Sequence, residues 1–152
     1  MLIKLFAIQR VRGDVVPRKN FSTIGNVDKI VHWMDHLRKA SKKFTIVCQH
    51  KKDRDFLKSF KCKNVVYPLE PVEDFIDIVV SMERPVILLY DGDRNSNSKY
   101  MKIKSLLQQH GVKINSGFRK IIFTQKARTF SGLLKYLHQL AGTERIHAGL
   151  PV

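Results

Sequence analysis

Two aspartates, Asp91 and Asp93, directly follow the apolar segment at residues 86–90, in the sequence VILLYDGDR. Two carboxylates one residue apart on a turn can face the same ion, and hard oxygen ligands of this kind suit Mg²⁺. In open α/β sheets, ligand sites form where a strand ends and a helix begins. Aspartates are also common in turns and at helix N-caps. The pair therefore predicts either a magnesium site or a capped turn.

The charge of the chain points to a polyanionic partner. Lys and Arg number 28 against 13 acids, which gives a formal net charge of +15. The acid that follows Asp93 in the sequence is Glu144, and ten basic residues lie between them. A solvated lysine-rich surface is the alternative, but such surfaces usually mix Glu with Lys. An acid-free basic stretch of this length indicates binding to nucleic acid or another anionic surface.

Hydrophobic periodicity divides the chain into alternating helices and strands that would position these residues. It predicts helices at 27–43, 51–60, 70–82, 98–109 and 129–140, and strands at 44–48, 63–68, 85–90 and 112–114. This alternation predicts an α/β domain with a parallel sheet of about four strands flanked by helices. We expect an N-terminal extension at 1–26, the domain at 27–141, and a C-terminal tail at 142–152 whose residues 144–152 are extended.

The segments TIVCQHKKDRDFL at 45–57 and VILLYDGDRNSN at 86–97 resemble the Toprim domains of topoisomerases, primases, repair proteins and small nucleases. In that family a glutamate follows the first core strand and a DxD turn follows the third. The chain is most similar to the small stand-alone archaeal Toprim proteins, which also have a GVK-type segment and a basic stretch like SGFRKIIF. It also resembles the Toprim maturase of 5S ribosomal RNA, but only in the shared core. The resemblance implies a compact Toprim-like (Rossmann-like) fold that acts on nucleic acid with Mg²⁺.

The chain departs from this family at the position of the glutamate, which is Gln49 here, and at its glycine neighbour, which is His50. Lys51 and Asp53 match the family pattern. The family glutamate is thought to act as a general acid/base or to support the metal. Gln49 cannot exchange a proton near neutral pH, so the resemblance implies a degenerate catalytic site with weak Mg²⁺ binding at most. His50 is an alternative base, although its side chain should point elsewhere.

Several basic residues are candidates for phosphate contacts because they surround the predicted site or follow it. These candidates are Lys51, Arg94, Lys99, Lys102, Arg119, Lys120, Lys126 and Arg128. In the stretch at 117–123, Phe118 and Phe123 alternate with basic residues, which suits base stacking. The same pattern fits a strand whose aromatic residues face the core. In either case we expect Arg119 and Lys120 to be available to phosphate.

Other arrangements of reactive residues are weaker. Cys48 and Cys62 have no CxxC or metal spacing, so we expect free buried thiols in a reducing compartment, the cytoplasm. His32 and His36 are better explained as surface or partly packed residues than as zinc ligands. The apolar runs are too short to span a bilayer, so we expect no membrane partner.

These observations favour a binding protein for structured nucleic acid, RNA rather than DNA, with the ribosome as a candidate partner. The alternative is a magnesium-dependent endonuclease or RNA-processing enzyme that uses Asp91 and Asp93. A third, weaker possibility is an interaction subunit of a primase-like or topoisomerase-like assembly.

Overall fold

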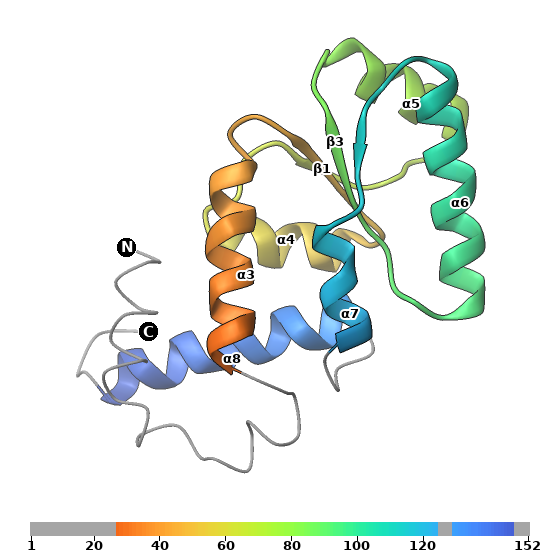
Figure 1. Ribbon diagram of the computed structural model, residues 1–152. Helices are drawn as coiled ribbons and strands as arrows, with labels where there is room; N and C mark the ends of the chain where they lie inside the picture. Colours follow the sequence, from red (N-terminus) through yellow and green to blue (C-terminus); the bar gives the residue numbers. More distant parts are fainter. Residues whose placement is uncertain (1–26, 125–128, 148–152) are drawn as a thin grey trace.

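Parallel strands form the centre of the molecule, and helices cover both faces of the sheet (Figure 1). The computed structural model describes residues 27–124 and 129–147, of which residues 141–147 are described by their backbone. The elements in chain order are α3 (Val27–Ala40), β1 (Thr45–Cys48), α4 (Lys51–Ser59), β2 (Val65–Val66), α5 (Val72–Ser81), β3 (Val86–Leu89), α6 (Arg94–Gln109), β4 (Ile114–Asn115), the 3-10 helix η1 (Phe118–Lys120), α7 (Ile121–Thr124) and α8 (Phe130–His147).

The four strands run in the order β2-β1-β3-β4, and every neighbouring pair is parallel. Register is defined by pairs such as Ile46 with Ile87, in the middle of the sheet. Every residue of β1 and β3 is buried, as expected for central parallel strands with both faces covered. The predicted α/β class, with a four-stranded parallel sheet flanked by helices, is confirmed.

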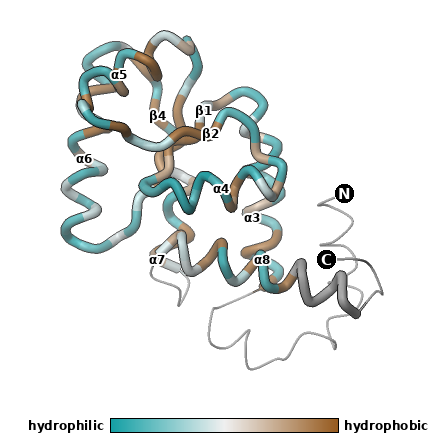
Figure 2. Tube along the Cα trace, turned by 180° about the vertical axis from the view of Figure 1, so that it is seen from behind, coloured by the Kyte–Doolittle hydropathy of each residue, from teal (hydrophilic) through white to brown (hydrophobic). Residues whose placement is uncertain are grey.

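Alternate residues of the central strands enter two separate cores, because successive side chains in a strand point to opposite faces. Ile46 and Leu89 join the core beneath α3, α4, α7 and α8. Val47 and Leu88 join the core beneath α5 and α6. Figure 2 shows hydrophobic strands at the centre, surrounded by helices that carry both hydrophilic and hydrophobic residues. Because β1 and β3 are parallel neighbours, their carboxyl ends lie side by side at one edge of the sheet, between the helices of its two faces.

Several predicted elements differ from the structure. β2 and β4 have two residues each and do not cover the predicted 63–68 and 112–114, and α3 ends at Ala40 rather than at residue 43. Helix α6 begins at Arg94 rather than at residue 98, because Asp93 caps it. Residues 118–124 form η1 and α7, not a strand, since the aromatic and basic alternation there follows a helical turn. Helix α8 continues to His147, so residues 144–147 are helical rather than extended. The predicted extension at 1–26 and the last five residues of the tail lie outside the described residues.

The end of α6 follows its sequence signal. Gly111 adopts a φ of 79°, the left-handed conformation that glycine accepts without a side-chain penalty, and it ends the helix as predicted.

Within residues 27–124 and 129–147, no helix has the length and apolar composition needed to cross a bilayer.

Candidate functional site

Gln49 and Asp91 meet at the carboxyl ends of the neighbouring strands β1 and β3. The main-chain N–H of Asp91 donates to Oε1 of Gln49 at 3.1 Å. Nε2 of Gln49 donates to Oγ of Ser96 at 2.9 Å. A backbone N–H can only donate, so it fixes which side of the amide faces Asp91. Gln49 therefore bridges the two strand ends to the first turn of α6.

The carboxylate of Asp91 is directed into the protein rather than toward solvent. Asp91 is 6% exposed, and its Oδ1 accepts the main-chain N–H of Phe130 at 2.8 Å. Burial raises the pKa of this carboxyl, and the nearby charge of Asp93 adds to that effect, while the bond from Phe130 opposes it. One oxygen of the predicted metal ligand thus holds the first residue of α8.

Asp53 lies beside Asp91 and performs a similar function. It is 1% exposed, and its Oδ1 accepts the hydroxyl of Ser131 at 2.5 Å. Burial raises the pKa of Asp53, and the charge of Asp91 raises it further. The two carboxylates face the amino end of α8, where the helix dipole favours negative charge. Asp53 matches the family pattern in the sequence, but it was not among the predicted site residues.

Asp93 differs from these two aspartates because it is exposed. Its Oδ2 accepts the main-chain N–H of Ser96 at 3.2 Å, which makes it the N-cap of α6. Hydrogen bonds from Ser96 hold the pKa of Asp93 below its ordinary value, so this carboxylate is ionised at neutral pH. The capped turn, one of the two predicted alternatives, is therefore present.

The donor set offers limited support for a cation. Among the residues the structure describes, no group of three or more His, Cys, Asp or Glu side chains is arranged to hold a metal ion. Asp91 and Asp93 each have one oxygen hydrogen-bonded to a backbone N–H, and Gln49 contributes no charge. Mg²⁺ often binds through one or two carboxylates and several waters. Because the carboxylate of Asp91 is buried and bonded to Phe130, Asp93 alone of this pair offers an exposed carboxylate, and the residues present give no positive support for a bound Mg²⁺.

Arg119 is buried, so the expectation that it is available to phosphate is wrong. It is 7% exposed, and its guanidinium donates to the carbonyl oxygens of Tyr90 and Asp91 at 2.8 Å each. It also donates to Oδ1 of Asn97 at 3.2 Å and lies 3.9 Å from the ring centroid of Tyr100. These contacts support the backbone that carries the two aspartates. A strand at 117–123 with its basic side chains facing water would have exposed Arg119. The helical turn that forms there directs Arg119 inward instead.

The two aromatic residues of this segment also have different roles. Phe118 packs against the core, and its carbonyl oxygen accepts the indole N–H of Trp33 at 2.9 Å. Phe123 is 61% exposed and covers Gly92, where a Cβ would lie 2.7 Å from the Phe123 ring. A larger residue between the two aspartates would therefore displace this ring. Phe123 remains available for stacking, whereas Phe118 does not.

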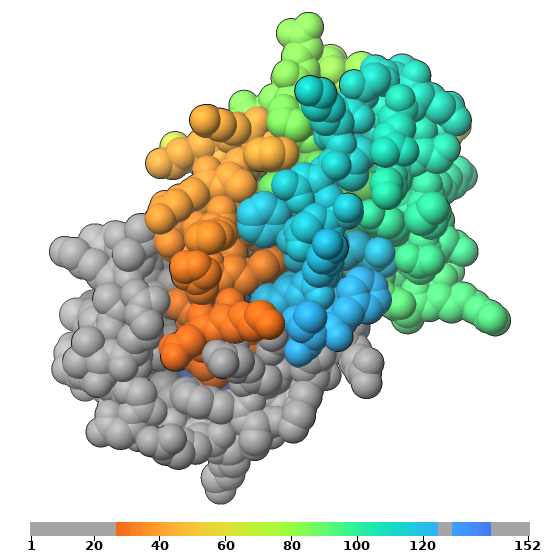
Figure 3. All heavy atoms as spheres, in the orientation of Figure 1, coloured from red at the N-terminus to blue at the C-terminus, as the bar shows by residue number. Residues whose placement is uncertain are grey.

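Five of the predicted phosphate-binding residues are exposed at or near this edge of the sheet. We call this set the cationic rim, and its members are Lys51, Arg94, Lys99, Lys102 and Lys120. Figure 3 shows one view of the outer surface of α6, together with the segment that contains η1 and α7. Lys126 and Arg128 lie outside the described residues.

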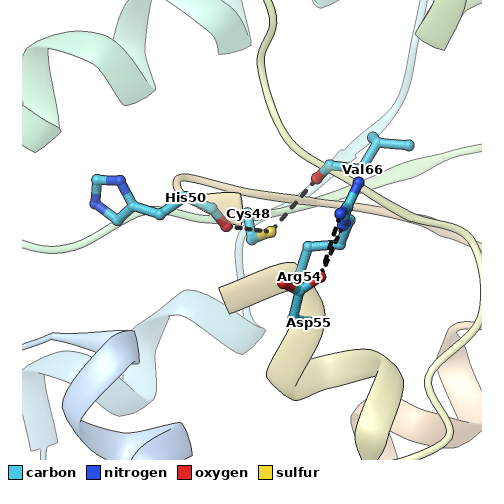
Figure 4. A network of polar contacts seen from close by, with 5 residues as sticks. All are labelled: Cys48, His50, Arg54, Asp55 and Val66. Carbon is cyan, nitrogen blue, oxygen red and sulfur yellow. Dashed lines mark hydrogen bonds and ion pairs between the residues drawn. The ribbon is translucent and has the colours of Figure 1, made fainter. Parts of the chain in front are cut away.

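Cys48 and His50 do not form a nucleophile and base pair. The thiol of Cys48 lies 3.5 Å from the carbonyl oxygens of His50 and Val66, and burial raises its pKa to about 12. Figure 4 shows the imidazole of His50 pointing away from that thiol. Cys62 is also a buried thiol, and burial raises its pKa to about 12. The predicted free thiols are present and protonated at neutral pH.

No protein-family model and no curated protein matches the chain. A solved structure of a protein from Aquifex aeolicus is similar to it, with a TM-score of 0.61 and 28% sequence identity. The similarity covers 70% of this chain and 97% of that chain. The description of the Aquifex aeolicus protein names no activity, ligand or partner. The two chains share this α/β fold.

Proposed function

We propose that this protein binds nucleic acid through the cationic rim and holds RNA in preference to DNA. The observation that carries the proposal is the charge of α6. Its 16 residues include Arg94, Lys99, Lys102 and Lys104 and no acid, and Arg94 occupies the first turn, where acids are normally favoured. Arg94 is placed against the helix dipole, and the three lysines that follow it have no acid on α6 to pair with, which favours an anionic ligand. Phosphate groups along a strand are the ligand that such a surface fits.

The preference for RNA rests on two supports. Phe123 is exposed beside the acidic turn, and exposed aromatic rings stack on unpaired bases, which are frequent in RNA loops and ends. The sequence also resembles the Toprim proteins, which include a maturase of ribosomal RNA. A structured RNA, with the ribosome as a candidate partner in the cytoplasm, is the ligand we favour.

We infer a binding role rather than catalysis from the polar contacts at the strand ends. Gln49 is neutral, and its amide already holds Asp91 and Ser96. Asp91 is buried and bonded to Phe130. These contacts suit a degenerate member of the Toprim family, in which the acidic turn stabilises the fold.

The alternative is a magnesium-dependent endonuclease or RNA-processing enzyme. One observation favours it: the ionised carboxylate of Asp93 is exposed only two residues from Asp91, at the carboxyl end of a central strand. Incubation of labelled RNA and DNA with Mg²⁺ or Mn²⁺ tests this alternative. Metal-dependent cleavage that disappears in an Asp91→Ala, Asp93→Ala variant would support the enzyme and refute the binding role as the sole function.

Fluorescence anisotropy with labelled single-stranded and double-stranded RNA and DNA tests the proposal. We expect the triple variant Arg94→Gln, Lys99→Gln, Lys102→Gln to bind RNA at least about tenfold more weakly. The matched control, Lys42→Gln, Lys43→Gln, Lys113→Gln, removes three exposed charges at the amino ends of the strands. It should weaken binding by about threefold or less. Equal losses in the two variants would show that net charge alone, and not the rim, governs binding.

A further inference from the structure

A pocket of about 380 Å³ opens at the carboxyl ends of the strands, on the side covered by α5 and α6. Sites for small ligands usually have volumes of about 300–1000 Å³, so this pocket can hold one nucleotide but not a duplex. It lies beside the turn that contains Asp91, and Gln49 and His50 form part of its wall.

Its lining has two chemical parts. Val72, Tyr90 and Ile103 provide apolar walls, which suit the flat face of a base. Lys99 and Lys102 line the α6 side, and a spacing of three residues places both on the same face of the helix. Both lysines are exposed, so their ammonium groups are free to move to a phosphate.

Two polar groups would orient the ligand. The Gln49 amide already makes one bond through each end, yet it retains one unused N–H and one lone pair, which can pair with the edge of a base. Glu70 lines the pocket from the segment between β2 and α5, whereas the two lysines line it from α6. Its negative charge repels phosphate and can accept a bond from a ribose hydroxyl. The phosphate would then lie toward α6, and the sugar and base toward α5.

We propose that this pocket binds a single nucleotide unit, and that it receives a terminal or unpaired nucleotide of the nucleic acid held by the cationic rim. The inference rests on the proposed function for the identity of the larger ligand. Gln49 would then help to recognise the nucleotide, because its amide presents both a donor and an acceptor, whereas a carboxylate would present acceptors only.

Calorimetric titration of the full chain with AMP, adenosine and inorganic phosphate tests the pocket without a long nucleic acid. We expect AMP to bind about tenfold more tightly than either part alone, because the two halves of the pocket are occupied together. The variant Lys99→Gln, Lys102→Gln should lose about tenfold in AMP affinity. The control Lys42→Gln, Lys43→Gln should leave it unchanged.

A second variant, Val72→Trp, fills the pocket without a change in charge, and circular dichroism confirms that it is folded. It should abolish AMP binding while a single-stranded RNA of about 30 nucleotides still binds to the rim, which is long enough to contact several phosphates. The pocket would not be a nucleotide site if AMP bound no more tightly than phosphate, or if AMP bound the lysine variant as tightly as the wild type. Binding of the RNA without AMP refutes this inference alone, and binding of AMP without the RNA refutes the proposed function alone.

Discussion

Arg119 and Lys120 are adjacent in the sequence, but they belong to two different regions of the molecule. Arg119 is 7% exposed and joins Asp53 and Asp91 in an inner polar group that hydrogen-bonds to the chain itself. Lys120 is exposed and belongs to the cationic rim. Asp91 and Asp93 show the same division two residues apart. Residue type and sequence position alone therefore do not separate charges that stabilise this fold from charges that are free to meet a ligand.

The largest expected effect separates the two adjacent cations. Arg119→Met leaves the carbonyl oxygens of Tyr90 and Asp91 buried without donors, which should lower the free energy of unfolding by about 3 kcal/mol. Lys120→Met should change it by no more than about 0.5 kcal/mol. Urea denaturation followed by circular dichroism measures both values.

RNA binding should give the opposite ranking for this pair. At a temperature where both variants are folded, Lys120→Met should weaken binding by about threefold, and Arg119→Met should leave it unchanged. If Arg119→Met reduced affinity more than Lys120→Met did, Arg119 would have to be assigned to the interface.

A smaller effect is expected at the amino end of α8. Asp91→Ala removes the acceptor for the main-chain N–H of Phe130, and it should lower the free energy of unfolding by about 2 kcal/mol. Asp91→Asn keeps an oxygen at that position, so it should be less destabilising than Asp91→Ala. Thermal unfolding compares the two variants. If both variants were as stable as the wild type, the bond between Asp91 and Phe130 would not stabilise the fold.

The smallest effect concerns the pH dependence of stability. Burial raises the pKa of Asp53 above its ordinary value of 3.8, so the folded state holds this proton more strongly than the unfolded state does. The contribution of Asp53 to stability is complete below the unfolded pKa and is lost as the pH rises through the folded pKa. Asp53→Asn removes this titration and has no charge to bury.

Denaturant midpoints measured from about pH 4 to pH 7 test this sign. We expect the Asp53→Asn variant to gain stability relative to wild type as the pH rises across this window. A gain in the opposite direction, toward acid, would mean that the carboxylate is stabilised in the folded protein rather than disfavoured by burial.

The fold could be predicted from the sequence because its signals are local and agree with one another. The continuous apolar runs at 45–48 and 86–89 mark the central strands, and helical periodicity marks the segments between them. Parallel pairing then follows from the short helical crossovers. The weaker signals failed at 118–124, where an aromatic and basic alternation fits both a strand and a helical turn.

The site could be predicted only in part, because its function depends on contacts between distant segments. The positions of Gln49 and Asp91, each directly after an apolar run, followed from the sequence, whereas their hydrogen bond depends on the pairing of β1 with β3. The burial of Arg119 and the bond between Asp53 and Ser131 did not, since they require the position of η1 and α8 relative to the sheet. The nucleotide-sized pocket likewise depends on three strand ends and two helices that periodicity alone cannot place.

The salt dependence of RNA binding tests the central claim most directly, namely that the cationic rim contacts phosphates. Each phosphate contact made with single-stranded RNA contributes about 0.7 to the slope of log K against log salt concentration. We predict that Arg94→Gln, Lys99→Gln, Lys102→Gln reduces the magnitude of this slope by about 2, while the control at the amino ends of the strands leaves it near the wild-type value. A slope that is the same in the triple variant as in wild type would contradict the account.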